Sequence, residues 1–366
     1  MQITAVKPNR EHYPALDGLR GIAILLVVFF HNFGFIRYFN FGWLGVDLFF
    51  VLSGFLITNI LMKEVGSKNY LKNFYVRRIL RIFPLYYLFL IVFLLILPNV
   101  ESYKDNLKYY TDNQWWIWTY LQNWLYVFKL PEETNLLLHL WSLGVEEQYY
   151  LIWPFVILFI RKPKWLLVLS LTILLLIMSI RFYLWYKNIE GFHYFTLYTF
   201  TRIDGLCIGS ALALIRILKP NFITYFTAPV ILFVAALNFI FYFINKTNNY
   251  SFPYFAIVGY TTFAVVFAIL VHEAATSNKN IITKILSIAP LRFLGKVSYG
   301  FYIFHWPVYI FLSPILINFL SKYFQTDHLI IQVSASFIAT LTGLVISIAS
   351  FYLFEMKFLQ LKKYFS

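Results

Sequence analysis

The sequence contains very little cysteine and very little charge. Cys207 is the only cysteine among 366 residues, which excludes an intrachain disulfide and a cysteine-based metal site. Charged residues make up 13% of the chain, whereas a soluble protein has about a quarter. Hydrophobic residues make up 60%, and the mean hydropathy is +0.69. This balance is typical of a protein that crosses a membrane several times.

Long hydrophobic runs predict an all-α polytopic membrane protein, a bundle of about ten transmembrane helices. Each run is long enough to cross about 30 Å of hydrocarbon. No cleavable signal peptide is evident, and we interpret the first run as a retained anchor. The predicted spans lie near 16–36, 42–62, 78–98, 138–160, 165–186, 195–216, 222–244, 252–272, 293–319 and 329–354.

The positions of lysine and arginine predict the orientation. With a cytoplasmic N-terminus, inside segments and adjoining helix ends hold 21 of the 30 basic residues, and outside segments hold 8. Both termini are therefore predicted to be cytoplasmic, in a multi-pass membrane protein. The formal net charge of +14 follows largely from this topology. Once the spans are removed, no soluble basic face remains for nucleic acid, so we expect no nucleic-acid partner.

One sizeable outside segment, near 99–137, contains the sequence WWIWTYLQNW. We interpret it as an interfacial amphipathic element rather than a folded domain, and as the region that selects an acceptor. No appended soluble domain is evident, so residues 1–366 are expected to form a single transmembrane domain.

The most informative pair of residues lies in the first span. Arg20 and His31 are eleven residues apart, so a helix places them on one stripe with a rise of about 16 Å between them. Charged and titratable groups are costly in hydrocarbon and usually face a bundle interior or a water-filled cavity. The pair therefore predicts chemistry on the first helix.

A basic cluster begins the third span, in YVRRILRIFPLYY. Arg78 and Arg81 are three residues apart and Arg77 and Arg81 four apart, which gathers them on one side of a helix. Guanidinium groups hold phosphate oxygens bidentately, as a phosphorylated donor such as an acyl-CoA requires. From composition alone, ordinary anchoring by positive charge at the inner face is the favoured interpretation.

Two carboxylates lie in the fourth span, in HLWSLGVEEQYYLIWP. His139 and Glu146 are seven residues apart and share a helix face, whereas Glu147 points about 100° away. At least one carboxylate should pair with a cation or a polar ligand. A buried ion-pair network that joins helices is an equally good interpretation.

Arg202 and Asp204 lie two residues apart in TRIDGLCIGSALAL and face nearly opposite ways on a helix. Each must find a partner on another helix, which predicts structural coupling. Gly205 and Gly209 predict close helix contact at the same place.

Two further polar residues have two interpretations each. His305, one turn from Tyr302, could help bind an acceptor, but a satisfied core histidine is favoured. Asp47, early in the second span, either orients His31 or Arg20 or caps its helix.

Together these motifs resemble the acyltransferase 3 family of integral-membrane O-acyltransferases. Arg20 and His31 match its arginine-ten residues-histidine motif, and Arg78 and Arg81 match its arginine-two residues-arginine motif. The blocks LDGLRGIA, GVDLFFVLSGFLIT, HLWSLGVEEQYYLIWP, RIDGLCIG and SYGFYIFHWP follow in the family's order. The resemblance covers essentially the whole chain. Some members carry a fused C-terminal esterase-like domain, and this chain looks like a standalone form.

The resemblance implies transfer of an acyl group, usually acetyl, from cytoplasmic acyl-CoA (acetyl-CoA) to a hydroxyl of a cell-surface or lipid-linked carbohydrate. His31 would act as the general base or would itself carry the acyl group. Arg78, Arg81 and Arg77 would bind the CoA phosphates. Arg20, Glu146 and Asp47 complete the candidate catalytic set.

Two other classes of function remain open. A transporter or flippase for a lipid-linked sugar would use the intramembrane charges to line a substrate path. A structural subunit would use them only to join helices. No metal is implied, because the seven histidines show no paired ligand spacing.

Overall fold

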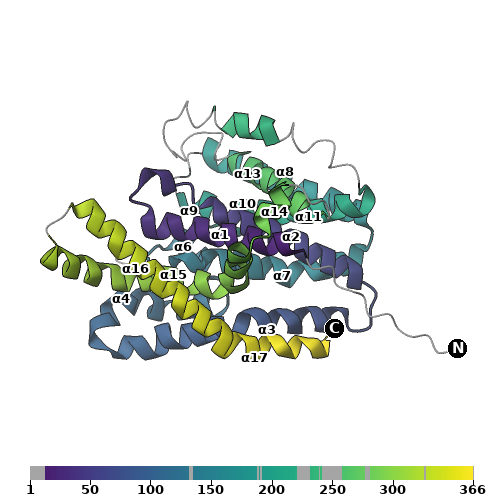
Figure 1. Cartoon of the computed structure of the whole chain (residues 1–366). Coiled ribbons are helices and arrows are strands. Elements are labelled where there is room, and N and C mark those ends of the chain that lie inside the picture. Colours follow the sequence, from purple (N-terminus) through teal and green to yellow (C-terminus); the bar gives the residue numbers. More distant parts are fainter. Residues whose placement is uncertain are drawn as a thin grey trace.

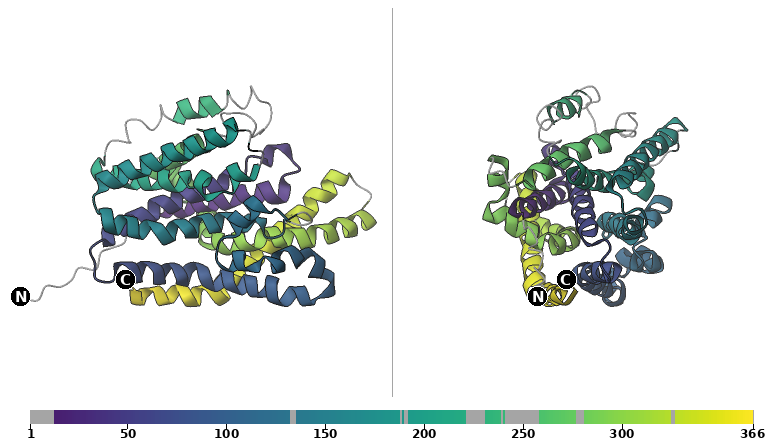
Figure 2. Two further views of the ribbon diagram at one scale, coloured as in Figure 1. Left: turned by 180° about the vertical axis from the view of Figure 1, so that it is seen from behind. Right: turned by 90° about the vertical axis from the view of Figure 1, so that its right-hand side faces the viewer.

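The computed structural model is a bundle of helices that lie side by side (Figures 1 and 2), and its described residues contain no strand. This confirms the predicted all-α class. The structure describes residues 13–131, 135–187, 189, 192–220, 231–238, 240, 258–276, 281–324 and 327–365. Its helices include α1 (Pro14–Phe33), α2 (Leu44–Glu64), α3 (Tyr70–Leu90), α4 (Glu101–Asp112), α5 (Gln114–Trp118), α6 (Gln122–Phe128), α7 (Trp141–Ile160), α8 (Pro163–Tyr186), α9 (Phe192–Thr196), α10 (Thr199–Arg202), α11 (Asp204–Leu218), α13 (Tyr260–Ala274), α14 (Ile281–Leu286), α15 (Ala289–Tyr323), α16 (His328–Ser350) and α17 (Met356–Leu361).

Within the described residues, seven helical segments are long and apolar enough to cross a membrane, and each corresponds to a predicted span. The prediction at 222–244 lies largely outside the described residues, and that at 252–272 is described only in part, as the shorter apolar helix α13. The seven segments are Pro14–Phe33, Arg37–Glu64, Tyr70–Asn99, Leu138–Ile160, Pro163–Tyr186, Ala289–Tyr323 and His328–Phe365.

The predicted span at 195–216 differs from the structure, which divides it among α9, α10 and α11. The breaks turn polar groups toward partners: Thr201 bonds to backbone carbonyls, and Thr199 accepts a hydrogen bond from the indole of Trp124 at 2.9 Å. Hydropathy does not detect these breaks because the apolar character continues through them.

Helix starts follow local sequence rules. α1 and α8 begin with proline, whose fixed φ and missing N–H suit the first helical position. The start of α16 is capped by Asp327, whose carboxylate accepts a hydrogen bond from the backbone N–H of Leu329 at 2.8 Å. These signals fix where the long helices enter the bundle.

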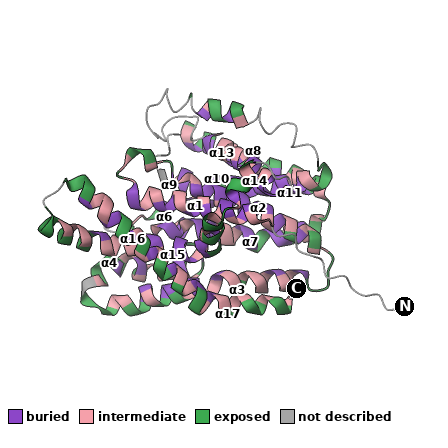
Figure 3. Ribbon diagram, in the orientation of Figure 1, coloured by how far each residue is buried: buried purple, intermediate pink, exposed green. Residues whose placement is uncertain are grey.

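The first helix lies in the middle of the bundle and is largely buried (Figure 3). It packs against α2, α13, α14, α15 and α16. Contact with α15 is close enough that a Cβ on Gly295 would lie 1.8 Å from the carbonyl oxygen of Asp17. Glycine at this position lets the two backbones approach each other directly, as in tightly packed membrane helices.

A second close contact joins α2 and α11. A Cβ on Gly209 would lie 2.1 Å from the carbonyl oxygen of Val51, and one on Gly205 would lie 2.9 Å from Cβ of Phe50. This confirms that the two small residues mark a tight helix contact.

Two buried ion pairs tie the same region together. Arg202 donates to Asp47 at 2.7 Å, and Arg181 donates to Asp204 at 2.9 Å. The pairs join α10 to α2 and α8 to α11, so the prediction that Arg202 and Asp204 find partners on other helices is confirmed. Removing one member of such a pair would leave a buried charge without its counter-ion.

The segment near 99–137 contains α4, α5 and α6, and part of it is buried against α3. The hydroxyl of Tyr86 donates to the carbonyl of Ile117 at 2.7 Å, and that of Tyr87 donates to Trp118 at 3.2 Å. Tyr120 has φ of 58° and stacks on Tyr86 with ring centroids 4.1 Å apart. The segment is therefore integrated into the bundle more deeply than an interfacial helix would be.

The C-terminal end of the described chain runs beside α3. A π-helical segment, Phe351–Glu355, connects α16 to α17, which lies along α3 (Figure 1). Arg77 on α3 donates to the carbonyl of Phe365 at 2.8 Å. This contact joins the C-terminal end of the described chain to α3.

Candidate active site

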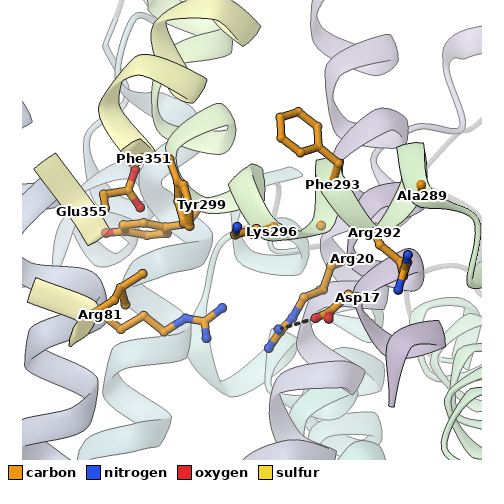
Figure 4. A pocket seen from close by; sticks show the side chains of 12 residues that line it. Asp17, Arg20, Arg81, Ala289, Arg292, Phe293, Lys296, Tyr299, Phe351 and Glu355 are labelled. Atoms are coloured by element: carbon orange, nitrogen blue, oxygen red, sulfur yellow. Dashed lines mark hydrogen bonds and ion pairs between the residues drawn. The ribbon is translucent and has the colours of Figure 1, made fainter. Parts of the chain in front are cut away.

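Arg20 faces a cleft of about 510 Å³ between α1, α3, α15 and the segment that follows α16. Figure 4 shows Arg20 and Arg81 extending toward each other from opposite sides of this basic cleft. Its charged residues are Arg20, Arg81, Arg292 and Lys296, with the carboxylates Asp17 and Glu355.

The basic cleft carries more positive than negative charge. Arg20 is 3.5 Å from Asp17, a long contact that leaves the guanidinium available to a ligand (Figure 4). Glu355 accepts a hydrogen bond from Ser350 at 3.2 Å. Four cationic side chains face two carboxylates, so the lining favours a ligand with several negative charges, such as a phosphorylated one.

A narrower inner chamber, of about 90 Å³, continues from the basic cleft. The two spaces share Arg20, Arg81 and Tyr299. Arg78 enters the inner chamber lining with its guanidinium 4.2 Å from the ring centre of Tyr150. The rest of the chamber lining combines tyrosines and serines with apolar side chains such as Phe49 and Leu56.

Glu146 also lines the inner chamber, and one of its carboxylate oxygens is buried without a hydrogen-bond partner. A buried polar atom of this kind is costly unless a ligand or water satisfies it. The atom is therefore a candidate contact for a polar group that enters the chamber.

The inner chamber ends at Ser142 and Tyr302. The Tyr302 hydroxyl donates to the carbonyl of His139 at 2.5 Å and lies 2.6 Å from the Ser142 hydroxyl. The backbone carbonyl of Tyr302 is in turn 2.8 Å from Nδ1 of His305. The chamber wall is thus continuous with a cluster of histidines.

This histidine cluster consists of His31, His139 and His305, one each from α1, the 3₁₀ segment before α7, and α15. Ring centres lie 5.0 Å apart for His31 and His305 and 5.4 Å apart for His139 and His305. His139 and His305 are buried, whereas His31 is half-buried. Across the described residues, no group of three or more His, Cys, Asp or Glu side chains is placed to hold a metal ion.

Hydrogen bonding fixes the tautomers of two of these rings. Nδ1 of His305 lies 3.0 Å from the carbonyl of Phe301 and 2.8 Å from that of Tyr302, so this nitrogen must carry the proton. In the neutral ring, Nε2 of His305 is then an acceptor, and it takes a hydrogen bond from Nδ1 of His31 at 3.0 Å. The lone pair of neutral His31 therefore lies on Nε2.

Comparison with known proteins gives the family. Residues 13–355 match the acyltransferase domain that defines the acyltransferase 3 family. The chain belongs to this family. The match includes the histidine cluster, the inner chamber and every charged residue of the basic cleft.

Curated relatives are similar over most of this chain. Peptidoglycan O-acetyltransferase OatA of Listeria monocytogenes is 32% identical, over 90% of this chain and 54% of its own length. Putative peptidoglycan O-acetyltransferase YrhL of Bacillus subtilis is 32% identical, over 84% and 50%. O-acetyltransferase OatA of Staphylococcus aureus is 32% identical, over 83% and 51%. The chain spans about half the length of these relatives. No solved structure matches it.

The family's two arginine motifs meet in the structure. Arg20, Arg78 and Arg81 line one inner chamber together with Glu146. His31 lies at the other end of α1, against His305. The roles themselves stay predictions.

Two predicted site residues lie elsewhere. Arg77 forms an ion pair with Glu64 and does not appear among the cleft-lining residues. Asp47 is ion-paired with Arg202 rather than with His31 or Arg20, and its side chain makes no capping hydrogen bond for α2. The structure places both residues in contacts that join helices.

Sequence reasoning missed part of the basic cleft. Arg292, Lys296 and Tyr299 follow one another at intervals of four and three along α15, which places them on one helix face. That spacing was visible in the sequence. Glu355 offered no comparable signal, because it reaches the cleft only through the turn from α16 into α17.

Proposed function

We propose that this protein is a membrane-bound O-acetyltransferase that moves an acetyl group from cytoplasmic acetyl-CoA to a hydroxyl of a cell-wall carbohydrate. One observation carries the proposal: a basic cleft adjoins an inner chamber whose Tyr302 contacts the histidine cluster, and hydrogen bonding in that cluster sets the lone pair of His31. The names of the relatives, which are O-acetyltransferases, support the same reaction.

The donor is proposed to enter from the basic cleft. Its phosphates would lie among Arg20, Arg81 and Lys296, where bidentate and charge-assisted hydrogen bonds are available. The pantetheine arm would extend into the inner chamber past Arg78 and Glu146. The thioester would then approach the histidine cluster from the side of Tyr302.

His31 is proposed as the general base. Its Nε2 would take the proton of the acceptor hydroxyl as that oxygen attacks the thioester carbonyl. The tetrahedral intermediate would collapse with cleavage of the carbon–sulfur bond, releasing CoA thiolate and the acetyl ester. The thiolate would then receive the proton from imidazolium. In a second route, Nε2 would attack the thioester first and release CoA thiolate. The acceptor hydroxyl would then attack the acetyl group on Nε2, which forms the acetyl ester and breaks the carbon–nitrogen bond. The hydroxyl proton would pass to the freed Nε2 and from there to the thiolate.

His305 is a positioning residue in this scheme. It accepts the Nδ1 proton of His31 in a hydrogen bond, while two backbone carbonyls hold its own orientation. Fixing one ring nitrogen through a partner selects the tautomer in which the other nitrogen can accept a proton.

The arrangement implies transfer across the bilayer. Arg20 and His31 are separated by about 16 Å along α1. We infer from the distribution of lysine and arginine that both termini and the basic cleft are cytoplasmic. The acceptor would then meet His31 near the outer side of a bacterial inner membrane. Because the relatives are named for peptidoglycan, a peptidoglycan glycan is the proposed acceptor class.

The test is acetyl transfer in proteoliposomes that contain the full chain. Radiolabelled acetyl-CoA is supplied on the cleft side, and acetyl groups on added peptidoglycan fragments are counted. His31→Ala should abolish transfer while acetyl-CoA still raises the Tm of the purified protein. His328→Ala, at an exposed histidine that starts α16, is the matched control and should transfer normally. Full transfer by His31→Ala would exclude the proposed base.

A further inference from the structure

An aromatic ring lies beside His31, a second ring stacks on the first, and neither has a part in the proposed chemistry. The ring centre of Trp306 is 5.0 Å from that of His31. Trp306 stacks on Tyr309 with ring centres 5.5 Å apart and an angle of 14° between the planes. We call Trp306 and Tyr309 the aromatic pair.

The aromatic pair lies on the side of α15 that faces the bundle. Angles around the axis of α15 are given from His305. Tyr309 lies at about 40° and Trp306 at about 100°. The buried Ser313 lies between them, at about 80°. The exposed Ile315, with 65% of its surface accessible, lies about 120° to 180° from the pair. The pair therefore does not belong to the outward face of the helix.

Both rings nevertheless remain half-exposed, whereas His305 and Ser313 on the same side are buried. The aromatic pair is thus partly accessible at the end of α1 that carries His31. His31 itself is also half-buried.

The orientation of Trp306 is fixed. Its indole N–H donates to the backbone carbonyl of Asn135 at 2.9 Å, in the segment that leads into α7. With the N–H engaged and one face stacked on Tyr309, the ring offers a ligand only its remaining apolar surface. Such a surface loses little conformational entropy on binding.

We propose that the aromatic pair is the acceptor-binding platform, on which a pyranose ring stacks so that one hydroxyl reaches Nε2 of His31. The inference rests on the proposed function and adds the residues that select a carbohydrate. One face of a pyranose presents C–H groups, which are attracted to the negative face of an aromatic ring. The sugar that carries the reacting hydroxyl must lie next to the general base, and the Trp306 ring is at that position.

The opposing explanation is that the aromatic pair anchors α15 at the membrane surface, because tryptophan and tyrosine are enriched there. That role would depend on exposure to the interface and would not affect the acceptor KM. Trp165 on α8 is 57% exposed and provides a matched control for it.

The experiment measures acetyl transfer to a β-1,4-linked N-acetylglucosamine tetramer in proteoliposomes. Trp306→Ala should raise the KM for the tetramer about tenfold while the KM for acetyl-CoA changes less than twofold. Tyr309→Ala should act in the same direction, and Trp306→Phe, which keeps a flat ring, should fall between Trp306→Ala and the wild type. Trp165→Ala should match the wild type. An unchanged tetramer KM in Trp306→Ala, or an equal rise in both KM values, would overturn the proposal.

Direct titration of the tetramer separates this proposal from the proposed function. Wild type and His31→Ala should bind the tetramer equally, and Trp306→Ala should bind it about tenfold more weakly. Binding by the wild type without transfer would leave the platform in place and count against the transferase. Undiminished transfer by Trp306→Ala would count against the platform and leave the transferase in place. Neither binding nor transfer in the wild type would overturn the platform.

Discussion

Nδ1 of His31 lies 3.0 Å from Nε2 of His305, and this contact joins α1 to α15 at the end of the bundle opposite Arg20. His305 is held by two backbone carbonyls of its own helix. The position of His31 therefore depends on α15 as much as on α1.

The first prediction concerns His305. His305→Phe removes the acceptor for the Nδ1 proton of His31, so kcat should fall about 10- to 100-fold, as when other groups that orient a functional histidine are removed. The KM for acetyl-CoA should stay within twofold. His305→Gln retains a polar group and should recover part of kcat, which a purely structural role would not explain. The pH dependence of kcat should also change in His305→Phe, because the remaining ring is no longer held in one tautomer.

The second prediction separates neighbouring arginines on α3. Arg81→Ala should raise the KM for acetyl-CoA about 10- to 100-fold, because charge-assisted hydrogen bonds to phosphate would be lost. Arg77→Ala removes a residue that pairs with Glu64 and lies outside the cleft lining, so its donor KM should stay near that of the wild type. The rise in Tm that CoA produces measures donor binding in both variants. Equal effects of the two substitutions would contradict the assignment of phosphate binding to the cleft.

The third prediction concerns the buried ion pair of Asp47 and Arg202. Asp47→Ala leaves the guanidinium buried without its carboxylate and should destabilise the protein by about 3 to 5 kcal/mol. Replacing both residues, as Asp47→Leu with Arg202→Met, should recover much of that loss. The free energy of unfolding in detergent is compared for the wild type, Asp47→Ala and the double variant. Equal stability of the single and double variants would show that the pair is not coupled.

The fourth prediction uses the close contact of α1 and α15. Gly295→Ala places a methyl group 1.8 Å from the carbonyl oxygen of Asp17, so the helices must separate, at a cost of about 1 to 3 kcal/mol. Lower Tm and lower transfer activity should appear together. Gly343→Ala on α16 is the control, because its added methyl group would be 3.4 Å from the nearest atom. Similar losses in both variants would count against a specific role of the contact.

Much of the architecture could be predicted from the sequence, because hydrophobic runs determine which segments cross a membrane. The seven long helices and the tight contact at Gly205 and Gly209 are confirmed. The division of 195–216 could not be predicted, since its breaks depend on partners such as Trp124 that lie far away in the sequence.

The candidate site was predictable in part. Arg20 and His31 stood out because polar groups are rare in apolar segments, and the family motif added Arg78 and Arg81. The contact between His31 and His305 spans 274 residues, and no local pattern reveals it. Asp47 looked like a site residue for the same reason as Arg20, and only the fold shows that Arg202 neutralises it.

One consequence follows from the unbroken course of α1. A single helix of 20 residues carries Arg20 and His31, and an α-helix neither stretches nor shortens appreciably. Under the proposed function, the length of α1 sets the distance between the anchored phosphates and the reacting carbonyl. A donor with a shorter arm would stop before His31, and an acyl group longer than acetyl would have to extend beyond it. Selection by length would then require no pocket shaped to the acyl group.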